Sequence, residues 1–352
     1  MPKRNRNRLA LCILLGALML SLTACEQPFR EKGQEVVLTT GFEEGEVIRY
    51  CIGEEAHTAS IRDGELSFYI AMLCEDYAHT FGRDVLRLSN GDFSILEYVW
   101  QDALTGLGTL KTKYLFALNE GFTITDDMRT EAEEEARSYM ASLTQEELTS
   151  LPVSKEELTT LLCEYKLGRK AYDSVTAEVD FEISDDDARS VSVQWIYIPT
   201  YTVNGAGDRV EYSELALSKA EDAIQEAGAA VLEGEDFFSV MSLYSKDTAE
   251  TRTVRKGDVE ELLEYCIFSL KRGEVSDVIK NRDGYYIVKC LVPMDEESTR
   301  KNRADILKKA QNDFYNERFA DFTAQVTEYS ETLKREDFVR GILLPHQILI
   351  EY

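Results

Sequence analysis

Two stretches with the alternating pattern of β-strands constrain the fold of this chain most. Residues 191–198 read VSVQWIYI and residues 284–289 read GYYIVK, and both are rich in β-branched and aromatic side chains. Between them lie an amphipathic helical pattern at 213–233, a second apolar segment after Gly234, a short helix at 262–270 and a strand-like stretch at 273–279. The order β-α-α-α-β-β predicts a domain at residues 188–294 with a small antiparallel sheet, in a chain of the α+β class.

Four ordered motifs in this segment resemble the parvulin (rotamase) family of peptidyl-prolyl isomerases. They are GEDFFSVMSLYSKD at 234–247, KGD at 256–258, FSLKRGEVS at 268–276 and GYYIVK at 284–289. The resemblance implies a groove that binds peptide, and in the family this groove catalyses prolyl isomerisation. Asp247 matches the Cys-or-Asp position of that groove. Leu263 falls where a Phe of the proline pocket is expected, and Phe268 matches a second Phe with a more structural role.

The segment departs from the family pattern at both positions where members usually carry a His. The first lies within Trp195-Ile196-Tyr197-Ile198, and the second is Tyr286. The expected site therefore combines Asp247, Trp195 and Tyr286, with Leu263 and Phe268 contacting substrate. The loop that normally supplies pocket residues is also shortened, at 256–260.

Prolyl isomerisation breaks no bond, so a catalyst needs only to favour the twisted amide. Loss of both His side chains therefore leaves two readings open, an isomerase with a rewired groove or a parvulin fold kept as a peptide-binding module.

The N-terminus carries the features of a secretion signal. Four cations, Lys3, Arg4, Arg6 and Arg8, precede an apolar run at 9–22, which is too short to span a membrane. The run ends in Leu22-Thr23-Ala24-Cys25, which resembles a bacterial lipobox. The resemblance implies that residues 1–24 are removed and that Cys25 is lipidated, anchoring the chain to the outer face of the cytoplasmic membrane. The alternative is an ordinary signal peptide with a chance Cys after Ala24.

The rest of the chain is expected to surround the parvulin-like segment with helices. Residues 25–40 are expected to form a tether and a short strand, and residues 41–187 a helical chaperone-like lobe with capping boxes at Thr144/Glu147 and Ser154/Glu157. A charged helix at 295–335 is expected to rejoin that lobe, followed by an apolar tail at 336–352. This layout resembles the extracytoplasmic foldases of the PrsA/SurA type.

Composition narrows the possible functions. The formal net charge of −26 argues against nucleic acid as a partner, because such binding relies on neutralising phosphates. Three scattered His residues and the lack of CxxC spacing predict no metal site, and the chain holds no phosphate loop or dinucleotide fingerprint. We therefore expect no cofactor.

Three functions remain open, and each predicts a different surface. A tethered foldase that binds unfolded or newly secreted polypeptides needs an apolar surface in the helical lobe. An active isomerase needs a proline-sized pocket beside Asp247, and a non-catalytic envelope adaptor needs neither. The identity of the clients and the oligomeric state are left open.

Overall fold

The computed structural model describes residues 42–330 apart from 54–56 and 91–92, together with 333–334, 338, 343–344 and 348–349. The expected signal, Cys25, the tether and the strand at 36–40 lie outside the described residues. The chain divides into two compact units, Asp180–Ala310 and a second unit made of Met1–Val179 with Gln311–Tyr352. We call the first the parvulin-like unit and the second the helical lobe. The expected α+β class is confirmed.

The helical lobe joins strands from both ends of the chain. Strand β1 (Glu46–Ile52) pairs antiparallel with β2 (His57–Arg62) and also with β11 (Val326–Ser330), with Cys51 opposite Thr327. The helix expected up to residue 335 is therefore wrong in its last part, because α11 (Glu296–Thr323) ends before this strand. β11 is a strand because it pairs with β1, which lies more than 250 residues earlier in the chain. The local sequence pattern cannot reveal such a distant partner.

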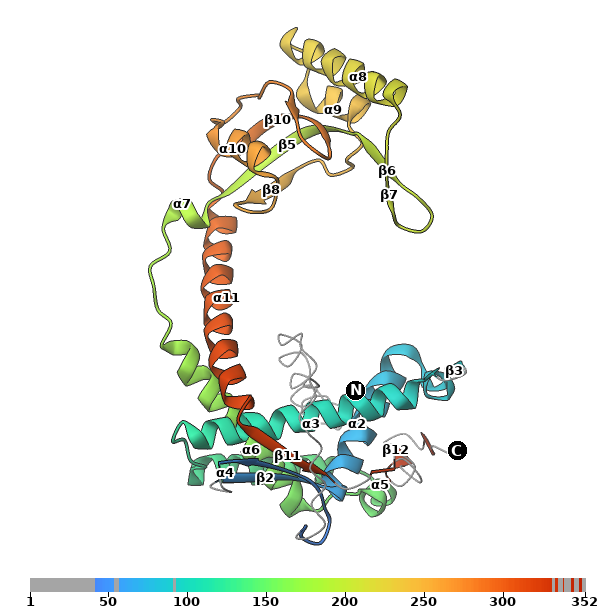
Figure 1. Cartoon of the computed structure of the whole chain (residues 1–352), viewed down its shortest axis with the longest axis vertical. Helices are drawn as coiled ribbons and strands as arrows, with labels where there is room; N and C mark the ends of the chain where they lie inside the picture. Colours follow the sequence, from blue (N-terminus) through green and yellow to red (C-terminus); the bar gives the residue numbers. More distant parts are fainter. Residues whose placement is uncertain are drawn as a thin grey trace. The chain divides into compact units, whose positions relative to one another are not determined.

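Helices cover these strands and form the main core of the lobe (Figure 1). Their sequences hold apolar residues at helical spacing, and both expected capping boxes form. The first of these helices ends at Phe81, because Gly82 turns the chain with a φ of 88° and a 3-10 helix, η1 (Arg83–Arg87), follows. The remaining elements are α2 (Asp63–Phe81), β3 (Ser89–Asn90), β4 (Phe93–Ser94), α3 (Ile95–Asn119), α4 (Asp126–Ser142), α5 (Gln145–Ser150) and α6 (Lys155–Ala177).

The second half of α11 packs into this core, as the sequence predicts. Tyr315 and Phe322 are buried, and both rings meet the ring of Phe116 edge-on, at 5.6 and 5.4 Å between centroids. Two short strands, β12 (Leu343–Leu344) and β13 (Ile348–Leu349), pair near the end of the chain. The other residues of the expected tail lie outside the described residues, except Phe338.

The parvulin-like unit is built on an antiparallel sheet of four strands in the order β8-β5-β10-β9. The strands are β5 (Ser190–Pro199), β8 (Arg252–Arg255), β9 (Ile279–Lys280) and β10 (Gly284–Val292), with a side hairpin of β6 (Tyr201–Val203) and β7 (Arg209–Glu211). The helices are α7 (Asp185–Ala188), α8 (Glu214–Leu232), α9 (Phe237–Tyr244) and α10 (Glu261–Ser269). The strand expected at 273–279 is mostly wrong, because only Ile279 and Lys280 pair as a strand and Val275 makes a single bridge to Lys289.

Each face of this sheet carries its own core. Tyr285 and Ile287 pack with α8 and α9 on one face, whereas Tyr286 and Val288 pack with α10 on the other. The expected alternation along β10 is confirmed. Gly284 opens this strand at a position where a Cβ would lie 2.2 Å from the carbonyl oxygen of Ile198, so the close approach of β10 to β5 requires glycine.

The unit extends beyond the expected limits of 188 and 294. The start of α11 is bonded to the start of β5, since Asn302 donates to the carbonyl of Ala188 and the Thr299 hydroxyl accepts from the backbone of Ser190. These contacts are buried, and they include the first turns of α11 in the same compact unit.

Candidate functional site

Three aromatic rings gather on the α10 face of the sheet, where β5 and β10 run side by side. Tyr286 of β10 pairs with Tyr197 of β5, and their rings stack with centroids 4.7 Å apart. Trp195, two residues earlier on the same strand, meets Tyr286 edge-on at 5.6 Å. Trp195 and Tyr197 are half-buried, whereas Tyr286 is buried. The two positions that differ from the family pattern thus form one packed aromatic cluster with Tyr197.

Asp247 lies against this cluster and is held by its neighbours. The indole Nε1 of Trp195 donates to Oδ2 of Asp247 at 2.6 Å. Arg252 donates from Nε to Oδ2 and from Nη2 to Oδ1, and the backbone N–H of Ala249 also donates to Oδ1. A carboxylate offers about four lone-pair positions, so these four donors occupy its acceptor capacity. The structure thus brings together the three residues expected to act together, Asp247, Trp195 and Tyr286.

The turn before Asp247 is bonded to β5, which fixes the position of the carboxylate. The Ser245 hydroxyl accepts from the backbone N–H groups of Tyr197 and Asp247, and Lys246 donates its N–H to the carbonyl of Tyr197. The motif SKD at 245–247 therefore docks on the strand that carries Trp195. This local arrangement explains why a Ser and an Asp are needed two residues apart.

The surroundings of the cluster keep the Asp247 carboxylate ionised and the Tyr286 phenol neutral. The guanidinium of Arg252, aided by the other donors and opposed by burial, lowers the pKa of Asp247 to about 2. Burial raises the pKa of Tyr286 to about 12. Near pH 7 the Asp247 carboxylate is ionised and fully hydrogen-bonded, so it is a poor general acid or base.

Sequence reasoning missed Arg252. Besides its two bonds to Asp247, its guanidinium lies 5.2 Å from the ring centre of Trp195, in a cation–π arrangement. None of the motifs includes this residue. One signal could have suggested its role. Arg252 lies close to Asp247 in the chain, at the start of a strand that pairs with β5.

The two expected substrate-contacting residues differ in accessibility. Leu263 of α10 is 1% exposed and belongs to the core beneath the sheet. Phe268 at the end of α10 is half-buried. Leu263 packs in the same core as Tyr286, and any contact between Leu263 or Phe268 and a peptide stays a prediction.

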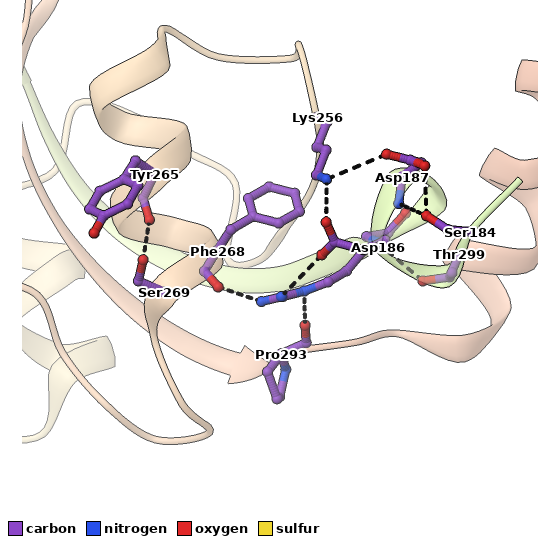
Figure 2. A network of polar contacts seen from close by, with 11 residues as sticks. Ser184, Asp186, Asp187, Lys256, Tyr265, Phe268, Ser269, Pro293 and Thr299 are labelled. Carbon is purple, nitrogen blue, oxygen red and sulfur yellow. Dashed lines mark hydrogen bonds and ion pairs between the residues drawn. The ribbon is translucent and has the colours of Figure 1, made fainter.

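Phe268 is held in place by Arg189 at the start of β5. The guanidinium lies 5.1 Å from the ring centre of Phe268, and it donates to the carbonyls of Phe268 and Pro293. Figure 2 shows Phe268, Pro293 and Asp186, the partners of Arg189, together with Lys256, which bonds Asp186 at 2.6 Å. Arg189 thus connects the end of α10 to the first and last strands of the unit.

Neither a cluster of metal-ligating side chains nor a membrane-spanning helix is found in the parts of the chain that the structure describes. Among those residues no three His, Cys, Asp or Glu side chains gather as a metal would need. Within the same ranges no helix is both long enough and apolar enough to cross a bilayer. The five cysteines there, Cys51, Cys74, Cys163, Cys266 and Cys290, form no disulfide.

Comparison with known proteins finds a family match that covers Asp247, Arg252 and Tyr286 of the site and begins after Trp195 and Tyr197. The family described as "Rotamase: PPIC-type PPIASE domain" matches residues 208–292. The foldase protein PrsA of Caldanaerobacter subterraneus subsp. tengcongensis is 25% identical over 306 residues, covering 83% of this chain and 86% of that protein. The foldase protein PrsA of Bacillus subtilis is 24% identical over 220 residues, covering 57% of this chain and 73% of that protein.

The chain is similar to the PrsA-type foldases, and its residues 208–292 match the parvulin domain. Among solved structures, the peptidylprolyl isomerase PrsA of Bacillus cereus covers 72% of this chain and 97% of its own, at 17% identity and a TM-score of 0.38.

Proposed function

We propose that this protein is a lipid-tethered foldase of the bacterial cell envelope whose parvulin-like unit binds peptide but does not accelerate prolyl isomerisation. The relation to PrsA foldases supports the part of the proposal that concerns folding of polypeptides outside the cytoplasm. The proposed lack of isomerase activity rests on one observation. The carboxylate of Asp247 already accepts four hydrogen bonds from within the unit.

A substrate in the groove of this unit would meet aromatic surface and few free polar groups. Trp195 and Tyr197 are half-buried, so part of each ring remains available to an apolar side chain or a proline ring. To bind the twisted amide more tightly than the planar amide, the site would have to offer donors or acceptors to the changing carbonyl and nitrogen. Asp247 has no acceptor position left to offer, and Tyr286 is buried. Such a site binds planar and twisted peptides about equally.

A small crevice in the helical lobe supports the part of the proposal that concerns binding of unfolded clients. An open crevice lies between α2, the end of α4 and α5, and its lining includes Phe68, Met72, Leu143 and Leu151. A surface of this kind can bind unfolded segments reversibly, and the acidic composition keeps the complexes soluble. We assign the main contact with unfolded clients to this lobe.

The test of this function is suppression of aggregation by the chain from Glu26 onward. We expect the protein to slow the aggregation of a chemically unfolded substrate in proportion to its concentration. An Asp247→Ala variant should do so to the same extent, because the parvulin-like site is not the main binding surface. Aggregation that proceeds equally with and without the protein would contradict the proposal.

The tether is tested separately through Cys25. In cells we expect the wild-type protein to sediment with membranes and Cys25→Ala to lose this association, since lipid on the thiol would be the only anchor we assign. A Cys12→Ala variant, which alters the apolar run without touching the lipobox, should remain with the membranes. Membrane retention of Cys25→Ala would show that another feature holds the protein there.

A further inference from the structure

The rings of the candidate site continue past the end of β5 into the side hairpin. Trp195 and Tyr197 lie two residues apart on one face of β5, and Tyr201 opens β6 soon after that strand ends (Figure 1). Burial raises the pKa of Tyr197 and the nearby phenol of Tyr201 adds to this shift, so the two phenols lie close together. These three rings are half-buried, and the buried Tyr286 contacts the first two. We call these four residues the aromatic strip.

An arginine covers the ring at each end of the aromatic strip. At one end the guanidinium of Arg252 lies 5.2 Å from the ring centre of Trp195. At the other end the guanidinium of Arg209 lies 3.8 Å from the ring centre of Tyr201. Both cations are already paired with carboxylates of the same unit. The aromatic strip therefore favours an uncharged ligand.

The hairpin is bonded to the turn before β10, which fixes Tyr201 relative to β5. Arg209 donates to the carboxylate of Asp283 at 2.6 Å and to the carbonyl of Arg282 at 2.7 Å. The backbone carbonyl of Asp283 also accepts from the hydroxyl of Tyr197 at 3.0 Å. The rings are thus held in place before a ligand arrives, which lowers the entropy cost of binding.

The hydrogen bonding of the aromatic strip favours ligand residues that carry no N–H. The indole N–H of Trp195 is donated to Asp247, and that carboxylate accepts four bonds in all. An ordinary peptide that places a backbone N–H against Trp195 would strip it of water and bring it to a carboxylate with no position left, which weakens binding. Proline has no N–H, and its ring packs against an aromatic face. Proline is therefore the residue type that this surface fits.

The length of the aromatic strip fits a run of prolines. The chain from Trp195 to Tyr201 spans at most about 20 Å, and about seven residues of a polyproline II helix cover that distance at about 3.1 Å each. This helix is populated before binding and has no internal hydrogen bonds. Surfaces lined by aromatic rings bind such helices because little ordering is needed.

We propose that the aromatic strip is a docking site for proline-rich segments in the polyproline II conformation, which it binds in the trans form without isomerising them. This inference rests on the proposed peptide-binding role of the parvulin-like unit and names its ligand class. It also assigns binding to Tyr201, which lies outside the expected site. Successive rings contact successive prolines, and no single prolyl bond is held at Asp247.

The test is a titration of two fluorescein-labelled synthetic peptides with the chain from Glu26 onward, followed by fluorescence anisotropy. One peptide is octaproline, and the matched peptide has eight alternating alanine and serine residues. We expect saturable binding of octaproline that is at least tenfold tighter than binding of the matched peptide. Equal affinity for the two peptides would overturn the assigned ligand class.

Three variants place the binding on the aromatic strip. Tyr201→Ala should weaken octaproline binding roughly fivefold or more, because one contacting ring is lost. Tyr201→Phe keeps the ring and should bind as wild type. Phe238→Ala removes a ring that is 40% exposed on α9, which packs on the opposite face of the sheet, and should also bind as wild type. Wild-type affinity in Tyr201→Ala, or an equal loss in Tyr201→Phe, would overturn ring contact at this position.

Failure of this inference can be told apart from failure of the proposed function. If the protein suppresses aggregation and binds both peptides equally, the foldase stands and the ligand class is wrong. If octaproline binds and Tyr201→Ala weakens it, but the protein neither suppresses aggregation nor leaves prolyl isomerisation unchanged, the aromatic strip stands and the proposed function is wrong.

Discussion

Asp247 accepts hydrogen bonds from the indole of Trp195, from two nitrogens of Arg252 and from the backbone of Ala249. Charge-assisted bonds of this kind are about twice as strong as neutral ones, and a carboxylate with four donors has little reason to exchange any of them for a substrate. The aromatic residues at the two departures from the family pattern thus change what the retained Asp can do. Its role here is to fix the turn at 245–247 on β5.

The first prediction concerns acid stability of the parvulin-like unit. Because the folded-state pKa of Asp247 is lowered to about 2, its contribution is fully present above the unfolded-state pKa near 4 and is lost as pH falls toward 2. We expect the ionised Asp247 to stabilise the folded unit by about 1–2 kcal/mol at neutral pH. The contribution should be near the low end of this range, because Arg252 is 43% exposed and solvent screens the pair. Asp247→Asn should therefore destabilise the unit at pH 7. It should also make the stability of the unit change less with pH between pH 4 and 2.

The measurement is unfolding followed by the fluorescence of Trp195 in a Trp100→Phe background, which leaves one of the two tryptophans. Asp277→Asn, an exposed carboxylate of the same unit, is the control and should leave the pH profile unchanged. A profile of Asp247→Asn that matches wild type between pH 4 and 2 would show that the four bonds add no net stability.

At this scale, the sequence predicted which residues meet but not how they interact. Strand alternation and the motif order correctly placed Trp195, Tyr286 and Asp247 together. The role of Arg252 could not be predicted, because its contact depends on the course of the turn after Asp247. Leu263 occupies the expected position in α10, yet the helix turns it into the core.

At the scale of elements, a buried ion cluster joins three helices of the lobe. Lys111 of α3 bonds Glu65 of α2 at 3.0 Å and Glu164 of α6 at 2.6 Å, and all three side chains are at most 9% exposed. Burial raises the pKa of the Glu164 carboxyl. The negative charge of Glu65, which shares the same cation, raises this pKa further. Glu65 also bonds the backbone of Arg62 at the start of α2, so the cluster fixes the beginning of that helix as well.

Removal of the cation should be costly. Lys111→Met leaves two buried carboxyls without a counter-charge, and we expect a loss of about 3–5 kcal/mol in the stability of the lobe. Urea unfolding followed by Trp100 in a Trp195→Phe background measures it. Lys170→Met, at an exposed position of α6, should change stability by less than about 0.5 kcal/mol. A loss for Lys111→Met as small as that of the control would contradict the assigned role.

Element boundaries show where local pattern suffices. The capping boxes fixed the starts of α5 and α6, because each depends on residues three positions apart. The end of α11 and the nature of β11 depended instead on pairing with β1. The stretch at 273–279 is hydrogen-bonded to β10 through Gly273, Glu274 and Ser276, yet only its last residue pairs as a strand. In both places a long-range contact decided the structure.

At the scale of the whole molecule, the chain combines a unit that keeps the parvulin fold with a lobe that carries an apolar crevice. Fold class and family could be predicted from the sequence, since several motifs occur in the family order over the whole unit. The crevice could not, because its lining comes from helices whose apolar residues look like ordinary core positions. The function we propose depends on this division, with binding in the lobe and no catalysis in the parvulin-like unit.

The central claim is tested most directly by the refolding of a substrate limited by proline isomerisation, whose uncatalysed slow phase takes tens to hundreds of seconds. The slow phase is measured with increasing amounts of the chain from Glu26 onward, and of its Asp247→Ala variant. We predict that neither protein changes the rate constant of this phase. An acceleration by the wild-type protein that Asp247→Ala abolishes would contradict the account and establish an isomerase built on Asp247, Trp195 and Tyr286.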